Sequence, residues 1–132
     1  MLKLTKKFEY GLLAIRHIAS TRNGDVATAK EIAERLHISH ELVSKTLQQM
    51  TKSGIISSVQ GVKGGYRLNK PAADISFSEI AEALEEPIQL IECDANPSGC
   101  DAFSGCGIKQ PLTKIQKRFR EIFDEAKVAE IL

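Results

Sequence analysis

Apolar residues recur every three or four positions near the start of the chain and predict a first helix. Thr5 is placed to cap this helix, which is expected to run to about Ser20. Its apolar positions are Phe8, Leu12, Ile15 and Ala19. The segment 21–25 then has the composition of a turn.

Two further helices are predicted by caps followed by apolar stripes. Thr28 and Glu31 have the spacing of a capping box, in which hydroxyl and carboxylate each bond the other residue's amide. After a break at 37–39, a third helix is expected to begin at Ser39 and to end at Ser53-Gly54. The residues expected to face inward from it are Leu42, Val43, Leu47 and Met50.

A β-hairpin and a fourth helix follow. Residues 55–59 and 66–68 are short β-prone runs, and the glycine-rich segment 61–65 between them predicts a turn. Ser76 and Glu79 form a second capping-box pattern, which opens a helix expected to stop before Pro87.

The last third of the chain combines an irregular segment with a long helix. Residues 92–111 contain two prolines, three glycines and all three cysteines. The helix after them carries an apolar seam with steps of three and four: Leu112, Ile115, Phe119, Ile122, Ala126 and Ala129. The seam either packs on its own domain or pairs with a second copy, and we favour pairing in a homodimer.

The order helix, helix, turn, helix, hairpin is that of a winged helix-turn-helix. The sequence thus predicts a mainly α protein with a small β-hairpin wing and a long C-terminal dimerisation helix. We place the DNA-binding domain at 1–86, a cysteine-containing loop at 87–111 and the dimerisation helix at 112–132.

Charge is strongly segregated although the net charge of the 132 residues is only +1. Residues 37–70 hold five lysines or arginines against one glutamate, whereas residues 71–108 hold eight acidic residues and no lysine or arginine. The basic block favours a polyanionic partner. No apolar run approaches the ~18 residues of a membrane span, and no secretory signal pattern is evident, so we expect a cytoplasmic protein without a membrane partner.

The basic block coincides with the predicted reading elements. A helix of this kind enters the major groove of double-stranded DNA, and its polar residues meet base edges. The candidate DNA-binding residues are Thr28, Ser39, His40, Glu41, Ser44, Lys45, Gln48, Lys52, Gln60, Lys63, Gly64 and Arg67. A two-fold dimer would place two such helices about 34 Å apart on a near-palindromic site. A winged helix that serves only protein contacts is the alternative.

Cys93, Cys100 and Cys106 lie within 14 residues of one another, among glycines and a proline. An odd number of cysteines in a cytoplasmic context argues against a disulfide framework. Zinc sites use tighter cysteine pairs, and the wide spacing suits an iron–sulfur cluster, either 2Fe–2S or 4Fe–4S. A metal-free thiol redox switch is the main alternative, and zinc or no bound group at all are the others.

Several motifs together resemble the small bacterial winged-helix regulators that include IscR, NsrR, RirA and CymR. The matching segments cover nearly the whole chain: 4–6, 38–39, 54–61, 63–68, Pro71, 75–76 and the three-cysteine loop. The resemblance implies a homodimeric transcription regulator. In its cluster-binding members, three such cysteines hold an iron–sulfur cluster whose state controls DNA affinity.

The resemblance also indicates the fourth ligand. IscR-type members have a histidine three positions after the third cysteine, but Lys109 stands there in this chain. NsrR-type members use a carboxylate from the partner's first helix, and the matching residue is Glu9. We therefore assign Glu9 in trans, with Asp94, Asp101, His17, water or a small thiol as competitors. Gln60 replaces the arginine that many members carry at the wing.

Our sequence-based hypothesis is a DNA-binding regulator controlled by an iron–sulfur cluster that senses iron, oxygen or redox state, or nitric oxide. The alternative is a metal-free thiol redox-sensing regulator. An enzyme is not expected, because His17, His37 and His40 have no evident catalytic partner in the sequence.

Overall fold

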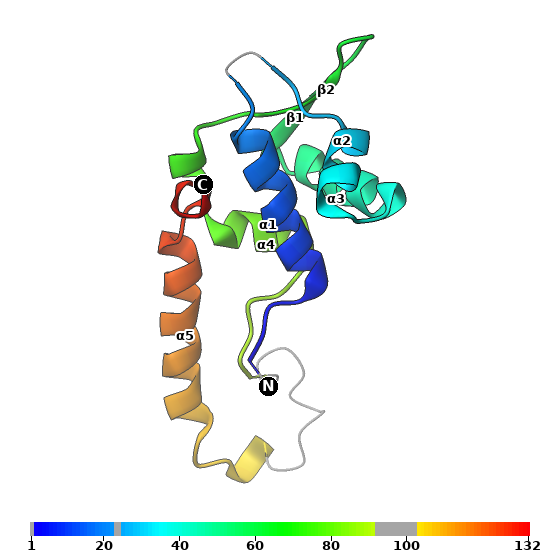
Figure 1. The fold of residues 1–132 in the computed structure, drawn as a ribbon. Helices are drawn as coiled ribbons and strands as arrows, with labels where there is room; N and C mark the ends of the chain where they lie inside the picture. The colour runs from blue at the N-terminus through cyan, green and yellow to red at the C-terminus, as the bar shows by residue number, and fades with distance from the viewer. Residues whose placement is uncertain (1, 23–24, 92–102) are drawn as a thin grey trace.

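The structure, a computed structural model, describes residues 2–22, 25–91 and 103–132. In these residues five α-helices pack together with a two-stranded hairpin, which lies at one end of the molecule, and short 3-10 turns (η) complete the chain (Figure 1). In chain order they are α1 (Lys6–Ala19), α2 (Ala29–Leu36), α3 (His40–Lys52), β1 (Ile56–Val59), β2 (Gly65–Leu68), η1 (Ala72–Asp74), α4 (Phe77–Ala83), η3 (Phe103–Gly105), α5 (Lys109–Glu125) and η4 (Val128–Ile131). The predicted mainly α fold with a hairpin wing is confirmed.

The first three predicted helix starts are present. The hydroxyls of Thr5, Thr28 and Ser39 accept backbone N–H groups at 3.2, 3.0 and 3.2 Å, respectively. The box predicted at Thr28 is only half realised, because the Glu31 carboxylate lies 3.2 Å from Nε2 of His17 on α1. The left-handed φ of 55° at His37 closes α2 and turns the chain into α3.

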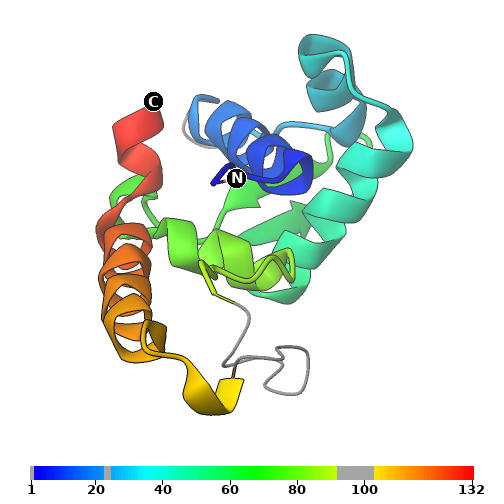
Figure 2. The same ribbon diagram turned by 90° about the horizontal axis from the view of Figure 1, so that it is seen from below.

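The core lies between α1, α3, α4 and the hairpin (Figure 2). Ile15, Leu47 and Ile80 are fully buried within it. Thr46 faces the same core, which the apolar pattern did not predict; it is 2% exposed, and its hydroxyl donates to the Leu42 carbonyl at 2.9 Å. The hydroxyl is thereby satisfied, so its burial carries no unpaired-group penalty.

The wing is an antiparallel hairpin in which Ile56 pairs with Leu68 and Val59 with Gly65. An isolated bridge between Ala27 and Tyr66 ties it to the residues before α2, with N···O distances of 3.0 and 2.8 Å. The wing is therefore joined to the helix-turn-helix by backbone hydrogen bonds.

The capping box at Ser76 is confirmed, with Oγ accepting from the Glu79 N–H at 3.1 Å and the Glu79 carboxylate accepting from the Ser76 N–H at 2.8 Å. The same carboxylate pairs with Lys70. Partial burial acts to raise the pKa of Glu79, but the hydrogen bonds from Lys70 and Ser76 outweigh it and hold that pKa below its ordinary value.

The C-terminal helix differs from its prediction. It begins at Lys109 rather than 112 and ends at Glu125, so Ala126 and Ala129 of the predicted seam lie beyond it. The chain turns there because Phe77 N–H donates to the Ala126 carbonyl and Val128 N–H to the Ile75 carbonyl, both at 2.9 Å. This pairing leaves Val128 fully buried.

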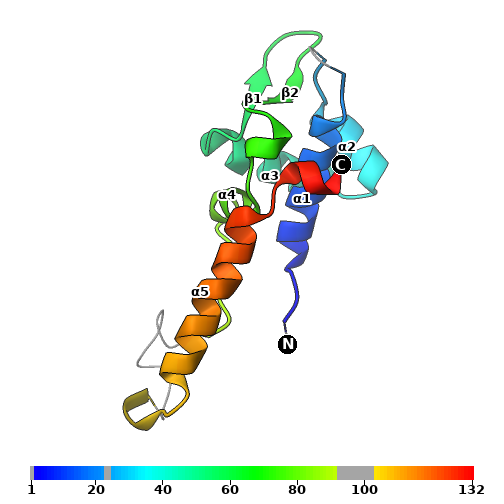
Figure 3. The same ribbon diagram turned by 90° about the vertical axis from the view of Figure 1, so that its left-hand side faces the viewer.

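Four phenylalanines fasten the C-terminal half of α5 to the core. Phe123 stacks on Phe8 with ring centroids 5.8 Å apart and meets Phe77 and Phe119 at 6.2 and 5.4 Å. The opposite half of α5 extends away from the helix-turn-helix (Figure 3). Within the described residues, no helix is both long and apolar enough to cross a bilayer.

Candidate nucleic-acid interface and cysteine site

The recognition helix α3 has two chemically distinct faces. Val43, Leu47 and Met50 are buried, at no more than 3% exposure each. The candidate contact residues lie on the other side: His40, Glu41, Lys45, Gln48 and Lys52 are exposed, and Ser44 is half-buried. The amphipathic pattern therefore directs the predicted polar set towards solvent.

Three side chains at the start of α3 also make local contacts. Ser39 accepts the Leu42 N–H at 3.2 Å, which leaves its hydroxyl proton available to a phosphate oxygen. The Ser44 hydroxyl lies 3.4 Å from Nδ1 of His40. These contacts order the N-terminal end of α3, the end that reads bases in helix-turn-helix proteins.

The wing presents Gln60, Lys63 and Arg67 as exposed side chains, with a fully exposed Val62 at the tip. Gly64 is required by the turn itself: a Cβ at this position would lie 2.3 Å from the Val59 carbonyl oxygen. The sequence predicts Gly64 at the interface because glycine, without a side chain, permits close approach to DNA. The structure adds that no other residue fits this turn without distortion.

A cleft of about 790 Å³ separates the wing from α2 and the end of α1. Thr28, Lys63, Gly64 and Arg67 of the predicted set line it. Arg22 and Arg35 line it too, although they are not among the DNA-binding residues predicted from the sequence. They come from a turn and from the last turn of α2, so no local motif marks them.

The candidate ligand set is described only in part. Cys93 and Cys100, with the competitors Asp94 and Asp101, lie outside the described residues. Cys106 is a half-buried free thiol between two glycines, three residues before α5. Its thiol chemistry suits a soft metal or an iron–sulfur cluster. The described residues alone contain no group of three histidine, cysteine or acidic side chains arranged to hold a metal ion.

Glu9 and its competitor His17 both lie on α1. Glu9 is half-buried and pairs with Lys6 at 3.0 Å, so a metal would have to displace an exposed ion pair. Exposed pairs of this kind contribute little to stability and do not block such an exchange. The side chain of His17 is 13% exposed and is engaged with Glu31. Lys109, at the position of the histidine ligand, is the first residue of α5.

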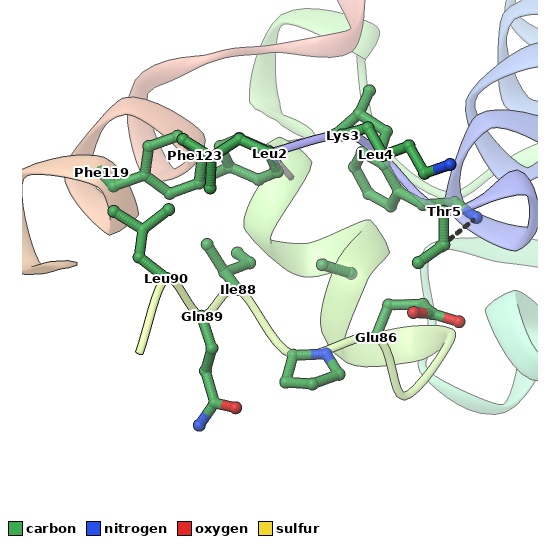
Figure 4. A pocket seen from close by; sticks show the side chains of 13 residues that line it. Leu2, Lys3, Leu4, Thr5, Glu86, Ile88, Gln89, Leu90, Phe119 and Phe123 are labelled. Carbon is green, nitrogen blue, oxygen red and sulfur yellow. Dashed lines mark hydrogen bonds between the residues drawn. The ribbon is translucent and has the colours of Figure 1, made fainter. Parts of the chain in front are cut away.

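An apolar pocket of about 310 Å³ lies between the N-terminal segment, residues 86–90 and α5 (Figure 4). Leu2 and Leu4 line it on one side and Phe119 and Phe123 on another. Gln116 closes the adjoining edge by donating to the Ile88 carbonyl at 2.6 Å. Residues 88–90, which lead towards the cysteine segment, are therefore attached to α5.

The predicted seam on α5 divides into two stripes. Phe119 is half-buried and belongs to the cluster with Phe123 that contacts the core. Ile115 and Ile122 of the seam, together with Ile108 just before α5, recur every seven residues and are 47, 59 and 62% exposed. One stripe therefore packs on the chain's own domain, and pairing of the other stripe with a second copy stays a prediction.

Comparison with known proteins places this arrangement among transcription regulators. Solved structures that resemble it include CymR (YrzC), described as the global cysteine regulator of B. subtilis, at 21% identity and a TM-score of 0.76 over 99% of this chain and 96% of that one. T. potens IscR matches at 25% identity and a TM-score of 0.76, covering 98% of this chain and 85% of that one. The oxidised form of Staphylococcus aureus CymR matches at 26% and 0.74, covering 96% and 93%.

The family model described as "Rrf2: Iron-dependent Transcriptional regulator" matches residues 4–132. Regulators of this family bind DNA and act as dimers, and they are not enzymes. Because the match spans nearly the whole sequence, the chain belongs to the Rrf2 family of transcription regulators.

Proposed function

We propose that the chain acts as a homodimer that binds a near-palindromic DNA operator and whose affinity is controlled at its three cysteines. The main observation that supports DNA binding is the division of α3 into a buried apolar face and an exposed polar face. Alongside it, the exposed Lys63 and Arg67 of the wing add positive charge. Such an arrangement supports base readout by α3 and phosphate contacts by the wing.

The dimer rests on α5. Ile115 and Ile122 on α5, with Ile108 just before it, are exposed at seven-residue intervals and form an apolar stripe that a second copy of the same segment would cover. A two-fold pairing would then present two copies of α3 to successive major grooves.

Selection of bound duplexes from a random-sequence pool tests the DNA assignment. The expected product is an inverted repeat whose half-sites are centred about 10 base pairs apart or a multiple of that. Gln48→Ala should weaken binding to this repeat and leave binding to unrelated DNA unchanged. A pool that shows no enrichment would contradict operator binding and favour the protein-contact alternative.

For sensing, we propose an iron–sulfur cluster held by Cys93, Cys100 and Cys106, with Glu9 of the partner subunit as fourth ligand. The description of the matching family as iron-dependent supports it, as does the half-buried free thiol of Cys106. When bound, such a cluster supplies a site that reacts with oxygen or nitric oxide or loses iron. The cysteine thiolates anchor it, and the carboxylate of Glu9 connects the subunits.

A metal-free thiol switch is the second candidate, and two observations favour it. Lys109 replaces the histidine ligand, and the similar structures include an oxidised form of CymR. In that case oxidant would form a disulfide or a sulfenic acid among the three cysteines, with no change in metal content.

Anaerobic purification with iron and sulfide analysis separates the two candidates. A brown protein whose visible absorption is abolished by Cys100→Ala supports the cluster. A colourless protein without iron that forms an oxidant-dependent disulfide would assign the thiol switch instead. Stoichiometric zinc in a colourless product would contradict both.

The trans carboxylate has its own test. Glu9→Ala should speed the bleaching of the cluster in air, because an oxygen ligand is lost, whereas Lys6→Ala should not. Equal bleaching rates in the wild type and the Glu9 variant would remove Glu9 from the ligand set and leave its competitors.

A further inference from the structure

The cleft between the wing and α2 brings together cationic side chains from four parts of the chain. Arg22 follows α1, Arg35 lies in the last turn of α2, Lys63 lies in the wing turn and Arg67 lies on β2. All four are exposed. None of the four side chains has an ion-pair or hydrogen-bond partner among the residues that the structure describes.

The acidic side chains of the cleft do not neutralise this group. Asp25 and Glu31 also line it, and the Glu31 carboxylate is held 3.2 Å from Nε2 of His17. Four cations therefore face two carboxylates, which leaves an excess of positive charge before His17 is counted. Unpaired guanidinium groups of this kind suit phosphate oxygens, which they can bind with two parallel N–H donors.

The position of the cleft indicates which phosphates would enter it. Thr28, Glu31 and Arg35 lie on one face of α2, opposite the wing residues Lys63 and Gly64. α2, α3 and the hairpin lie together at one end of the molecule (Figure 1). A duplex held by α3 and the wing tip would run its sugar-phosphate backbone along this opening.

We propose that the cleft binds the DNA backbone and that Arg22 and Arg35 are phosphate-contacting residues in addition to those of α3 and the wing. This inference rests on the proposed function. In contrast to the base contacts of α3, the contribution of these two arginines is independent of DNA sequence.

The experiment measures the affinity of the full-length protein for the selected operator and for an unrelated duplex over a series of salt concentrations. Arg22→Gln and Arg35→Gln should each weaken binding to both duplexes by the same factor. Because a dimer loses two phosphate contacts per substitution, the slope of log K against log salt should become shallower by about 2. Thermal unfolding checks that the variants fold.

Two further variants make the test specific. Lys117→Gln removes the same charge from α5 and should leave the slope unchanged. Glu31→Gln keeps a hydrogen-bonding group for His17 but removes a negative charge from the cleft, so DNA binding should tighten by about threefold at low salt. A purely structural role of the cleft would not produce tighter binding.

The measurements distinguish a failure of the cleft inference from a failure of the proposed DNA binding. Slopes for the Arg22 and Arg35 variants equal to that of Lys117→Gln would overturn the inference while leaving operator binding by α3 intact. If those variants bind DNA normally but lose calorimetric binding of pyrophosphate, the cleft is a site for a free anion and not for DNA. A wild-type protein that binds neither duplex overturns the proposed function and this inference together.

Discussion

Gly64 shows how a single position constrains the wing. A Cβ there would meet two backbone carbonyl oxygens, at 2.3 Å from Val59 and 2.8 Å from Gly61. Backbone atoms cannot move aside as the end of a side chain can. The wing turn therefore depends on glycine for steric reasons.

Gly64→Ala should lower the free energy of unfolding by about 2 kcal/mol, because the turn must open to admit the methyl group. Urea denaturation measures this loss. Gly105→Ala is the matched control, since none of the residues that the structure describes lies within 4 Å of its Cβ position, and it should unfold like the wild type. Equal stability of the two variants would show that the turn adapts.

Glu79 makes the stability of the α4 start dependent on pH. Its pKa is lowered from the ordinary 4.5, since the hydrogen bonds from Lys70 and Ser76 outweigh the effect of burial. A lowered pKa in the folded state means that the charged form stabilises the fold above pH 4.5, and that this contribution disappears as the pH falls through the folded pKa.

Urea denaturation of the wild type and Glu79→Gln should therefore differ at pH 7 and converge in acid. The carboxylate is partly exposed, so the difference is expected to be small. Lys70→Gln should reduce the same difference by removing the ion pair. Denaturation curves that stay equally far apart at pH 7 and below pH 4 would exclude this linkage.

At the scale of elements, local signals were predictable and distant pairings were not. A cap involves four consecutive residues, so Thr5, Ser39 and Ser76 could be identified from sequence alone. Glu31 instead contacts His17 on another helix, and Val128 pairs with Ile75 across more than fifty residues. A heptad pattern carries no information about such a pairing, which is why the end of α5 was misplaced.

The candidate interface followed the same rule. Residues on α3 could be assigned from helical periodicity, because one buried face fixes the opposite one. Arg22 and Arg35 reach the cleft only through the packing of α1, α2 and the wing. The sequence could not reveal that neighbourhood.

The exposed stripe of α5 yields a test of assembly. Ile115→Asp and Ile122→Asp should shift the protein from dimer to monomer, because each places two charges in an apolar interface. Sedimentation at several concentrations measures the change. Lys117→Asp alters the charge of the same helix away from the stripe and should remain dimeric. Dimers that persist in both isoleucine variants would locate the interface elsewhere.

The whole molecule separates its charges along the chain. The basic reading elements occupy 37–70, and the acidic block of 71–108 contains the cysteines. Negative charge near the duplex would oppose binding, so we expect the acidic block to lie away from the DNA-facing side.

If a dimer contacts about six to eight phosphates, the wild-type slope of log K against log salt should be about −5 to −7. Fluorescence anisotropy with a labelled operator provides the slope. An affinity that hardly changes between low and high salt would argue against docking through the basic elements.

The attachment of α5 has a mechanical consequence. Its 17 residues form a rod of about 25 Å. That rod is pinned at one end, where the strand-like pairing of 126–128 with 75–77 and the aromatic rings hold it. Cys106 lies just before the opposite end. A small tilt of α5 imposed at that end would rotate the helix about Ile75–Phe77, at the start of α4. The movement would therefore be transmitted to the core of the domain before it reached the wing.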